Sequence, residues 1–143
     1  MASSKTQDKK PRLLYLILCD TLTTDSYGKK TLVGTFDRLS SAQLPCVIRL
    51  FNIVTGWEGL EGDYTMTAKN EGQNAIVFSS PPIGLRFEKP LHRADAILQV
   101  ANLKFDEPGL YTVTISLSDG RSWSHPLLVE HAAGGNMSQE KVT

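Results

Sequence analysis

Apolar and polar residues alternate with a period of two over much of this chain, which is the pattern of β-strands that bury one face. Residues 110–117 are the clearest case. The apolar positions of this segment are Tyr111, Val113, Ile115 and Leu117, and the polar positions between them are Thr112, Thr114 and Ser116. The segment is therefore predicted to be a half-buried strand.

A second strand is predicted to pair with this one in a hairpin. Asp119-Gly120 follows the first strand and supplies the positive φ angles of a tight turn. Residues 121–129 then return, with Trp123 and Val129 on one face. Pro126 removes a backbone donor, so the returning strand is expected at a sheet edge or interrupted at this residue.

Several more segments have the character of strands. Residues 46–55 are apolar on both faces, as in a central strand, and residues 63–69 alternate between turn-forming sequences. Shorter candidates lie at residues 75–79, 85–87 and 94–100. The apolar phase shifts near Ala101 and Asn102, which predicts a bend or bulge. This spacing favours a sandwich or small barrel, with a short helix as the alternative for residues 36–44.

Composition narrows the class of protein. The chain has 143 residues, 41% of them hydrophobic, which suits one globular domain and excludes disorder. The chain has 15 Lys and Arg residues and 15 Asp and Glu residues, so its formal net charge is zero. A nucleic acid partner, which would require a basic surface, is therefore not expected. The apolar run at residues 13–19 is far shorter than the ~20 residues that cross a bilayer, so no membrane span is expected. We predict one β-sandwich domain over residues 12–131, between flexible tails at 1–11 and 132–143.

The cysteines indicate the compartment. Cys19 and Cys46 form no C-x-x-C pair and no disulfide framework, which fits a reducing environment and predicts a cytoplasmic protein. The basic start followed by residues 13–19 is similar to a secretory signal. Leu18, however, stands where a cleavage site needs a small residue, so export is not predicted.

Tyr111 is the residue with the clearest structural role. A Pro-Gly turn at residues 108–109 precedes it, and it is the first core-facing residue of its strand. In immunoglobulin-like sandwiches a tyrosine at this place bonds back to the upstream backbone and fixes the corner between sheets. The alternative is an ordinary core aromatic with its hydroxyl at the rim.

The order of several short motifs resembles a family of small bacterial proteins of unknown function. The motifs are L-C-D at residues 18–20, D-x-x-G-K at 25–29, L-V-G-x-F-D at 32–37 and P-G-x-Y at 108–111. The resemblance implies an immunoglobulin-like fold and supplies no catalytic residue. We therefore predict an all-β, immunoglobulin-like antiparallel β-sandwich of about seven to nine strands.

Candidate catalytic and metal-binding groups are sparse. His92, His125 and His131 stand alone, without the spacing of a metal site, and Ser124 and His125 point to opposite faces of one strand. Three aspartates, Asp20, Asp25 and Asp37, have no known calcium-loop spacing and are interpreted as solvated or turn-capping. No cofactor and no metal ion are expected.

These absences favour a non-enzymatic binding or assembly module with a protein partner. One alternative is a carbohydrate-binding module that uses Trp57, which stands among glycines in an expected loop, in preference to Trp123. Trp57 is otherwise interpreted as a loop aromatic folded over the end of the core. A further alternative is an enzyme whose site is built from loops and leaves no motif.

The first strand is apolar on both faces, although only one face of a strand in a sandwich meets the core. Leu13, Tyr15 and Ile17 form one face, and the other consists of Leu14, Leu16 and Leu18. We expect self-association through Leu14, Leu16 and Leu18. The alternative is an internal cover formed by residues 56–62 or by a terminal tail.

Overall fold

The computed structural model describes residues 10–60, 62–73, 76–87 and 92–132. In this part of the chain there are ten strands and no helix, and thus no helix that could cross a membrane. The expected tails at 1–11 and 132–143 lie outside the described residues, apart from Lys10, Pro11 and Ala132. The strands are β1 (Arg12–Thr24), β2 (Lys30–Phe36), β3 (Arg38–Ser41), β4 (Cys46–Glu58), β5 (Asp63–Glu71), β6 (Ile76–Ser79), β7 (Ile83–Arg86), β8 (Arg93–Phe105), β9 (Gly109–Leu117) and β10 (Ser122–His131).

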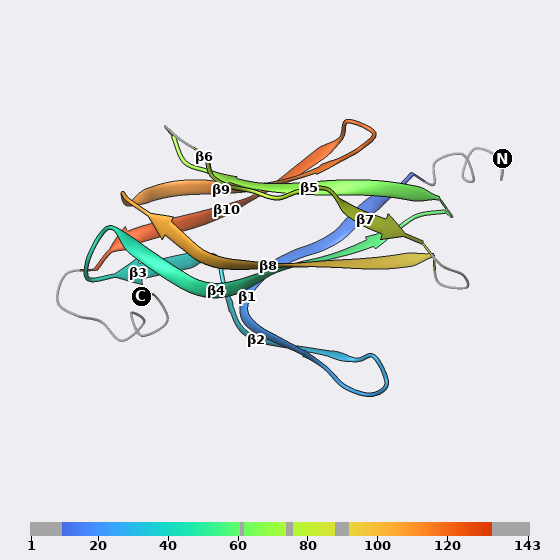
Figure 1. The fold of residues 1–143 in the computed structure, drawn as a ribbon, viewed down its shortest axis with the longest axis horizontal. Coiled ribbons are helices and arrows are strands. Elements are labelled where there is room, and N and C mark those ends of the chain that lie inside the picture. The colour runs from blue at the N-terminus through green and yellow to red at the C-terminus, as the bar shows by residue number, and fades with distance from the viewer. Residues whose placement is uncertain (1–9, 61, 74–75, 88–91, 133–143) are drawn as a thin grey trace.

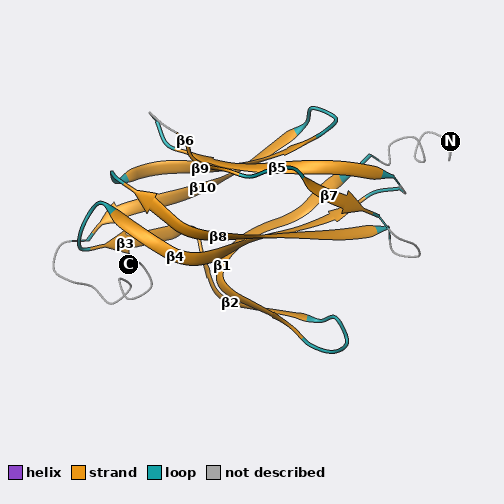
Figure 2. Ribbon diagram, in the orientation of Figure 1, coloured by secondary structure: helices purple, strands orange, loops and turns teal. Residues whose placement is uncertain are grey.

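The strands form two sheets that pack face to face, as Figures 1 and 2 show. Sheet A has the strand order β2-β1-β4-β8. Sheet B has the order β3-β10-β9-β5-β6, and β7 also pairs with β5. All pairs are antiparallel except β3 with β10. The all-β prediction is confirmed, and the strand count exceeds nine because short strands flank the main ones.

The connections between the sheets are those of an immunoglobulin-like sandwich. Strands β1, β4 and β8 lie in one sheet, and β5, β9 and β10 lie in the other, in the arrangement of strands A, B and E against C, F and G. The chain passes from sheet A to sheet B at Asp37, between β2 and β3. Residues 36–44, the alternative helix, contain strand β3 instead.

Aromatic side chains from both sheets meet between the layers. Trp57 of β4 contacts Trp123 of β10 edge to face, with ring centroids 5.1 Å apart. Phe105 of β8 contacts Tyr111 of β9 in the same way at 4.8 Å. Such pairs add specific geometry to the area that they bury. Each of these two pairs connects sheet A to sheet B.

Two local predictions have a clear outcome. Pro126 lies in β10 opposite Thr112 of β9, while β3 pairs with β10 only from Leu128 onward, so the missing donor faces an open edge. Asn102 has a φ angle of 54°, which is the predicted bend. No bulge is present, since β8 and β4 keep one register on both sides of Asn102. The alternation of buried and exposed residues shifts in β4 as well, at the exposed Arg49, which lies next to Asn102 in this register.

Strand β4 is buried on both faces, which a two-layer sandwich does not explain by itself. Phe51 faces sheet B, and so do Ile53 and Trp57 beyond it. Val54 points to the outer side of sheet A, yet its exposed fraction is 0%. Asn52, two residues earlier on this outer side, is 6% exposed. A third layer must therefore cover the outer face of sheet A.

That layer is the hairpin of β1 and β2. Strand β1 pairs with β4 only as far as Cys19, and the hairpin beyond it folds back under sheet A, below β8 in Figure 1. Lys30 of the hairpin reaches Asp95 of β8, with Nζ 2.5 Å from Oδ2. Leu22 and Leu32 are half-buried on the same face of the hairpin as Lys30, so this face is turned toward sheet A.

The predicted interface on the first strand is corrected by this arrangement. Leu18 is 1% exposed in the core, Leu16 packs against the core, and Leu14 lies at a register shift where β1 changes face. The outer face of β1 is instead formed by Tyr15, Ile17 and Cys19. The predicted alternative of an internal cover therefore holds, but its location differs. Residues 56–58, part of the predicted covering loop, belong to strand β4, and the hairpin of β1 and β2 forms the cover.

Tyr15 contributes to the cover by lying across Gly56. Its hydroxyl donates to Asp95 Oδ1 at 3.3 Å, so the ring crosses β4 to reach β8. A Cβ atom at position 56 would stand 2.3 Å from the Tyr15 ring. Burial and the nearby Asp95 both raise the pKa of the Tyr15 hydroxyl, which keeps it a donor. The absence of a side chain at Gly56 leaves the space that the Tyr15 ring occupies.

We predict that Gly56→Ala lowers the free energy of unfolding by about 1–3 kcal/mol, because the added methyl group collides with the Tyr15 ring. Chemical denaturation measures the effect. Gly84→Ala is the matched control, since a Cβ atom there meets nothing within 4 Å. In a Tyr15→Leu background the cost of Gly56→Ala should shrink, and an unchanged cost in that background would contradict this explanation.

Candidate functional site

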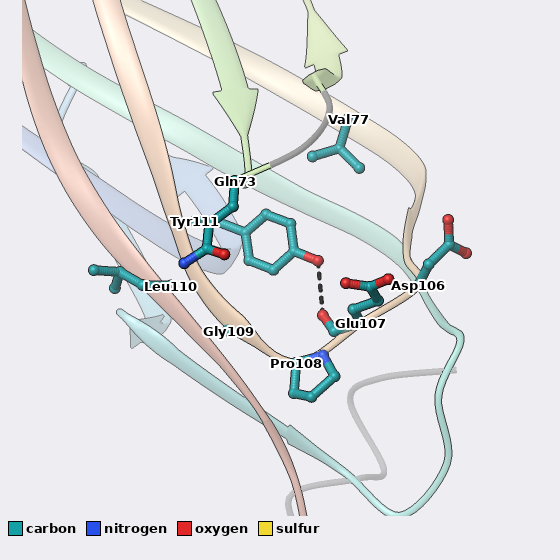
Figure 3. Close-up of a pocket in the computed structure, with 9 residues that line it drawn as sticks. Gln73, Val77, Asp106, Glu107, Pro108, Gly109, Leu110 and Tyr111 are labelled. Carbon is teal, nitrogen blue, oxygen red and sulfur yellow. Dashed lines mark hydrogen bonds between the residues drawn. The ribbon is translucent and has the colours of Figure 1, made fainter.

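A pocket of about 180 Å³ lies at the corner between β8 and β9. Its lining comes from the turn before β9, from the chain after β5 and from β6, and Figure 3 shows it closely. The lining residues are Gly72, Gln73, Val77, Asp106, Glu107, Pro108, Gly109, Leu110 and Tyr111. Segments that lie far apart in the sequence therefore form this pocket, which we call the corner pocket.

Tyr111 forms the centre of the corner pocket. Its hydroxyl donates to the carbonyl oxygen of Glu107 at 2.7 Å, which is the upstream backbone contact that the corner prediction specifies. Burial raises the pKa of the Tyr111 hydroxyl, and the bond to Glu107 opposes this only in part. A Cβ atom at Gly72 would lie 2.8 Å from the ring, so glycine is needed to seat the tyrosine. The hydroxyl thus remains a structural donor.

The pocket combines an apolar wall with carboxylates. Val77 and the Tyr111 ring are apolar, and Figure 3 shows the Asp106 and Glu107 carboxylates on the side opposite Gln73. Asp106 has an ion pair with Lys104, with Nζ 3.6 Å from Oδ1, and both are exposed. Glu107 forms no ion pair within the described residues. The pocket is suited to a group that has an apolar stem and a positive end.

A buried amide lies next to the corner pocket. Asn70 is 1% exposed in β5, two residues before Gly72, and its register partner in β9 is Val113. Neither polar atom of its side chain has a hydrogen-bond partner in the described part of the chain. Asn70 is not among the residues predicted from the sequence, although it continues the buried alternation of Met66 and Ala68 by two residues.

The tryptophans do not provide the predicted sugar-binding surface. Trp57 lies within β4 and is 0% exposed, so the assignment of Trp57 as a loop residue that contacts a ligand is wrong. The indole Nε1 donates to Thr55 Oγ1 at 2.9 Å. Trp123 is half-buried, and the Arg121 guanidinium lies 5.2 Å over its ring. The Trp57 ring is therefore closed to a ligand, and one face of the Trp123 ring is covered by Arg121.

The histidines lie apart from one another and from the corner pocket. His131 is within 2.9 Å of the Ala42 carbonyl, and His92 accepts a backbone bond from Gly59 through its own carbonyl. His125 lines a second, more open hollow of about 250 Å³ where β2 passes to β3. Its Nε2 atom is buried without a partner in the described region.

The thiols and aspartates are also dispersed. Cys19 lies on the outer side of sheet A and Cys46 in the core, and burial raises the pKa of both thiols. Asp25 caps its turn by accepting from the backbone nitrogens of Tyr27 and Lys29, at 2.8 and 2.9 Å. Among the described residues, no three His, Cys, Asp or Glu side chains gather as a metal site.

The fold and the corner pocket define an immunoglobulin-like β-sandwich domain with one acidic corner. The chain belongs to a family described only as "Family of unknown function (DUF6941)", which it matches over residues 14–130. No curated protein matches the chain.

Three of the solved structures that are similar to this chain illustrate its fold. Two are of a β-glucosidase from Listeria innocua, in complex with isofagomine (TM-score 0.48) and with glucose (TM-score 0.47). Both are 10% identical and cover 88% of this chain, which spans 17% of the enzyme chain. The third is the CARDB domain of a Pyrococcus furiosus protein in complex with di-metal ions, at 8% identity and TM-score 0.37, covering 80% of this chain and 87% of that domain.

We predict that Tyr111→Phe lowers the free energy of unfolding by about 1–2 kcal/mol while the fold is retained, because the Glu107 carbonyl loses its partner. Thermal and chemical unfolding measure the change. Tyr27→Phe serves as the control, since Tyr27 is 87% exposed and should show no effect. Equal stability of the Tyr111 variant and the wild type would leave Tyr111 as an ordinary core aromatic.

We predict that Asn70→Val raises the free energy of unfolding by about 1 kcal/mol, because it removes a buried amide that has no partner. Asn52→Val is the matched control. Asn52 is also buried, but its Nδ2 donates to the Asp20 carbonyl at 3.4 Å, so its replacement should lower stability. If both variants lose stability, Asn70 has a compensating contact and the prediction is wrong.

Proposed function

We propose that this domain is a non-enzymatic binding module, and that the corner pocket receives a basic side chain of a protein partner. The observation that supports this proposal is the combination of an apolar wall, at Val77 and Tyr111, with the Glu107 carboxylate. The aliphatic stem of a lysine or arginine packs against such a wall while its charged end stays in contact with a carboxylate and water.

The size of the corner pocket favours a side chain over a whole small molecule. Sites for small molecules commonly occupy ~300–1,000 Å³. The corner pocket measures about 180 Å³. A single side chain from a larger partner fits this volume, and further contacts would come from the surface around the pocket, where Leu110 is 56% exposed.

The chemistry around the corner pocket supports binding in preference to catalysis. The Tyr111 hydroxyl is bonded to the backbone and its raised pKa keeps it protonated, so it is a poor base. Among the described residues that line the pocket there is no serine, threonine, cysteine or histidine. A nucleophile paired with a base would be needed for covalent catalysis. Two buried free thiols, Cys19 and Cys46, support the proposal of a reducing, cytoplasmic location.

The test is a titration of the isotope-labelled protein with N-acetyl-lysine methylamide, followed by amide NMR. We expect shifts at Gly72 and Gly109, and none with the uncharged N-acetyl-norleucine methylamide. Glu107→Gln should weaken binding about two- to fivefold, the factor for an exposed ion pair. Asp63→Asn, outside the pocket, is the control. Shifts spread over the whole surface, or equal binding of the norleucine compound, would contradict the proposal.

A further inference from the structure

Strand β2 is the end strand of sheet A and pairs only with β1. The backbone groups on its other side face no strand in the described part of the chain. Pairing with β1 keeps one register on both sides of Gly34, with Val33 opposite Thr21 and Thr35 opposite Cys19, although Gly34 itself has a φ angle of 72°. An open edge of this kind is a template for a further strand.

This edge lacks the usual protection against pairing. Natural edge strands commonly carry charged residues or proline, yet residues 31–36 contain neither. Lys30, at the start of the strand, is directed to Asp95 of the same chain and does not face outward as a free charge. The outward face of β2 presents Thr31, Val33 and Thr35, and Val33 is 54% exposed. β-Branched residues are the types that pair well across strands.

The sequence of β2 is complementary to itself when two copies run antiparallel. A two-fold axis at Val33 places this residue opposite its own copy and Thr31 opposite Thr35 of the partner subunit. Just outside the strand, the same register places Lys29 opposite Asp37 of the partner subunit, and the symmetry repeats this pair. Lys29 and Asp37 are exposed, and neither forms an ion pair within the described residues.

We propose that two copies of this chain associate through antiparallel pairing of β2 with β2, centred on Val33. The two A sheets then form one continuous sheet, and opposite charges lie across both ends of the new strand pair. This interface does not involve the corner pocket, so each proposal stands or fails separately.

Sedimentation velocity over a concentration series tests the interface with the full chain. The wild type should sediment as a dimer at tens of micromolar. Asp37→Lys places like charges opposite each other twice and should weaken the dimer about tenfold or more. Lys29→Glu, in an exposed turn, should have the same effect through two acidic residues. The double variant with Lys29→Asp and Asp37→Lys restores opposite charges and should recover the dimer.

Asp63→Lys is the control, because it makes the same change in charge far from β2 and should leave the dimer intact. Circular dichroism and melting temperature verify that each variant is folded. A wild type that is monomeric throughout the series overturns the proposal. So does a dimer that is unaffected by both single charge reversals, or a double variant that stays monomeric.

Discussion

The burial of β4 on both faces is the constraint on which the rest of this structure depends. One face, with Phe51 and Trp57, is covered by sheet B in the manner of any sandwich. The other face, with Val54, would be in water if sheet A were simply the outer layer. Apolar area of this kind is stabilising only when it is removed from water. The chain meets the requirement by folding its own hairpin of β1 and β2 back over the sheet.

The hairpin cover explains several details that otherwise have no common cause. Gly56 has no side chain because the Tyr15 ring lies across it, and Asp95 holds both the Tyr15 hydroxyl and the Lys30 ammonium group. An isolated two-stranded ribbon is at best marginally stable in water. Its half-buried leucines and the ion pair of Lys30 attach it to the sheet. The same folding leaves the outer edge of β2 available, which links the stability of the fold to the proposed association.

At the other end of the sandwich, Tyr111 organises the corner between β8 and β9. Its bond to the Glu107 carbonyl fixes the turn that carries the acidic residues, while Gly72 lets the chain after β5 approach the ring. Asn70 lies beside this point as a buried amide without a partner, a feature that lowers stability wherever it occurs in a core. The corner thus joins a structural tyrosine to the acidic surface at which binding of a basic side chain is proposed.

The sequence by itself determined the all-β class, the hairpin of β9 and β10 and the central place of β4. Each of these follows from local alternation or turn chemistry, and local signals survive in a single sequence. It left Tyr111 open between a corner tyrosine and an ordinary core aromatic, and the structure shows the backbone contact of the corner tyrosine. Tertiary structure decided which face of β1 meets the core, because a register shift at Leu14 reverses the alternation. It also decided that Trp57 is buried, and it formed the corner pocket from segments far apart in the chain. Such features depend on which strands become neighbours, and the alternation of apolar and polar residues within one strand does not specify its neighbours.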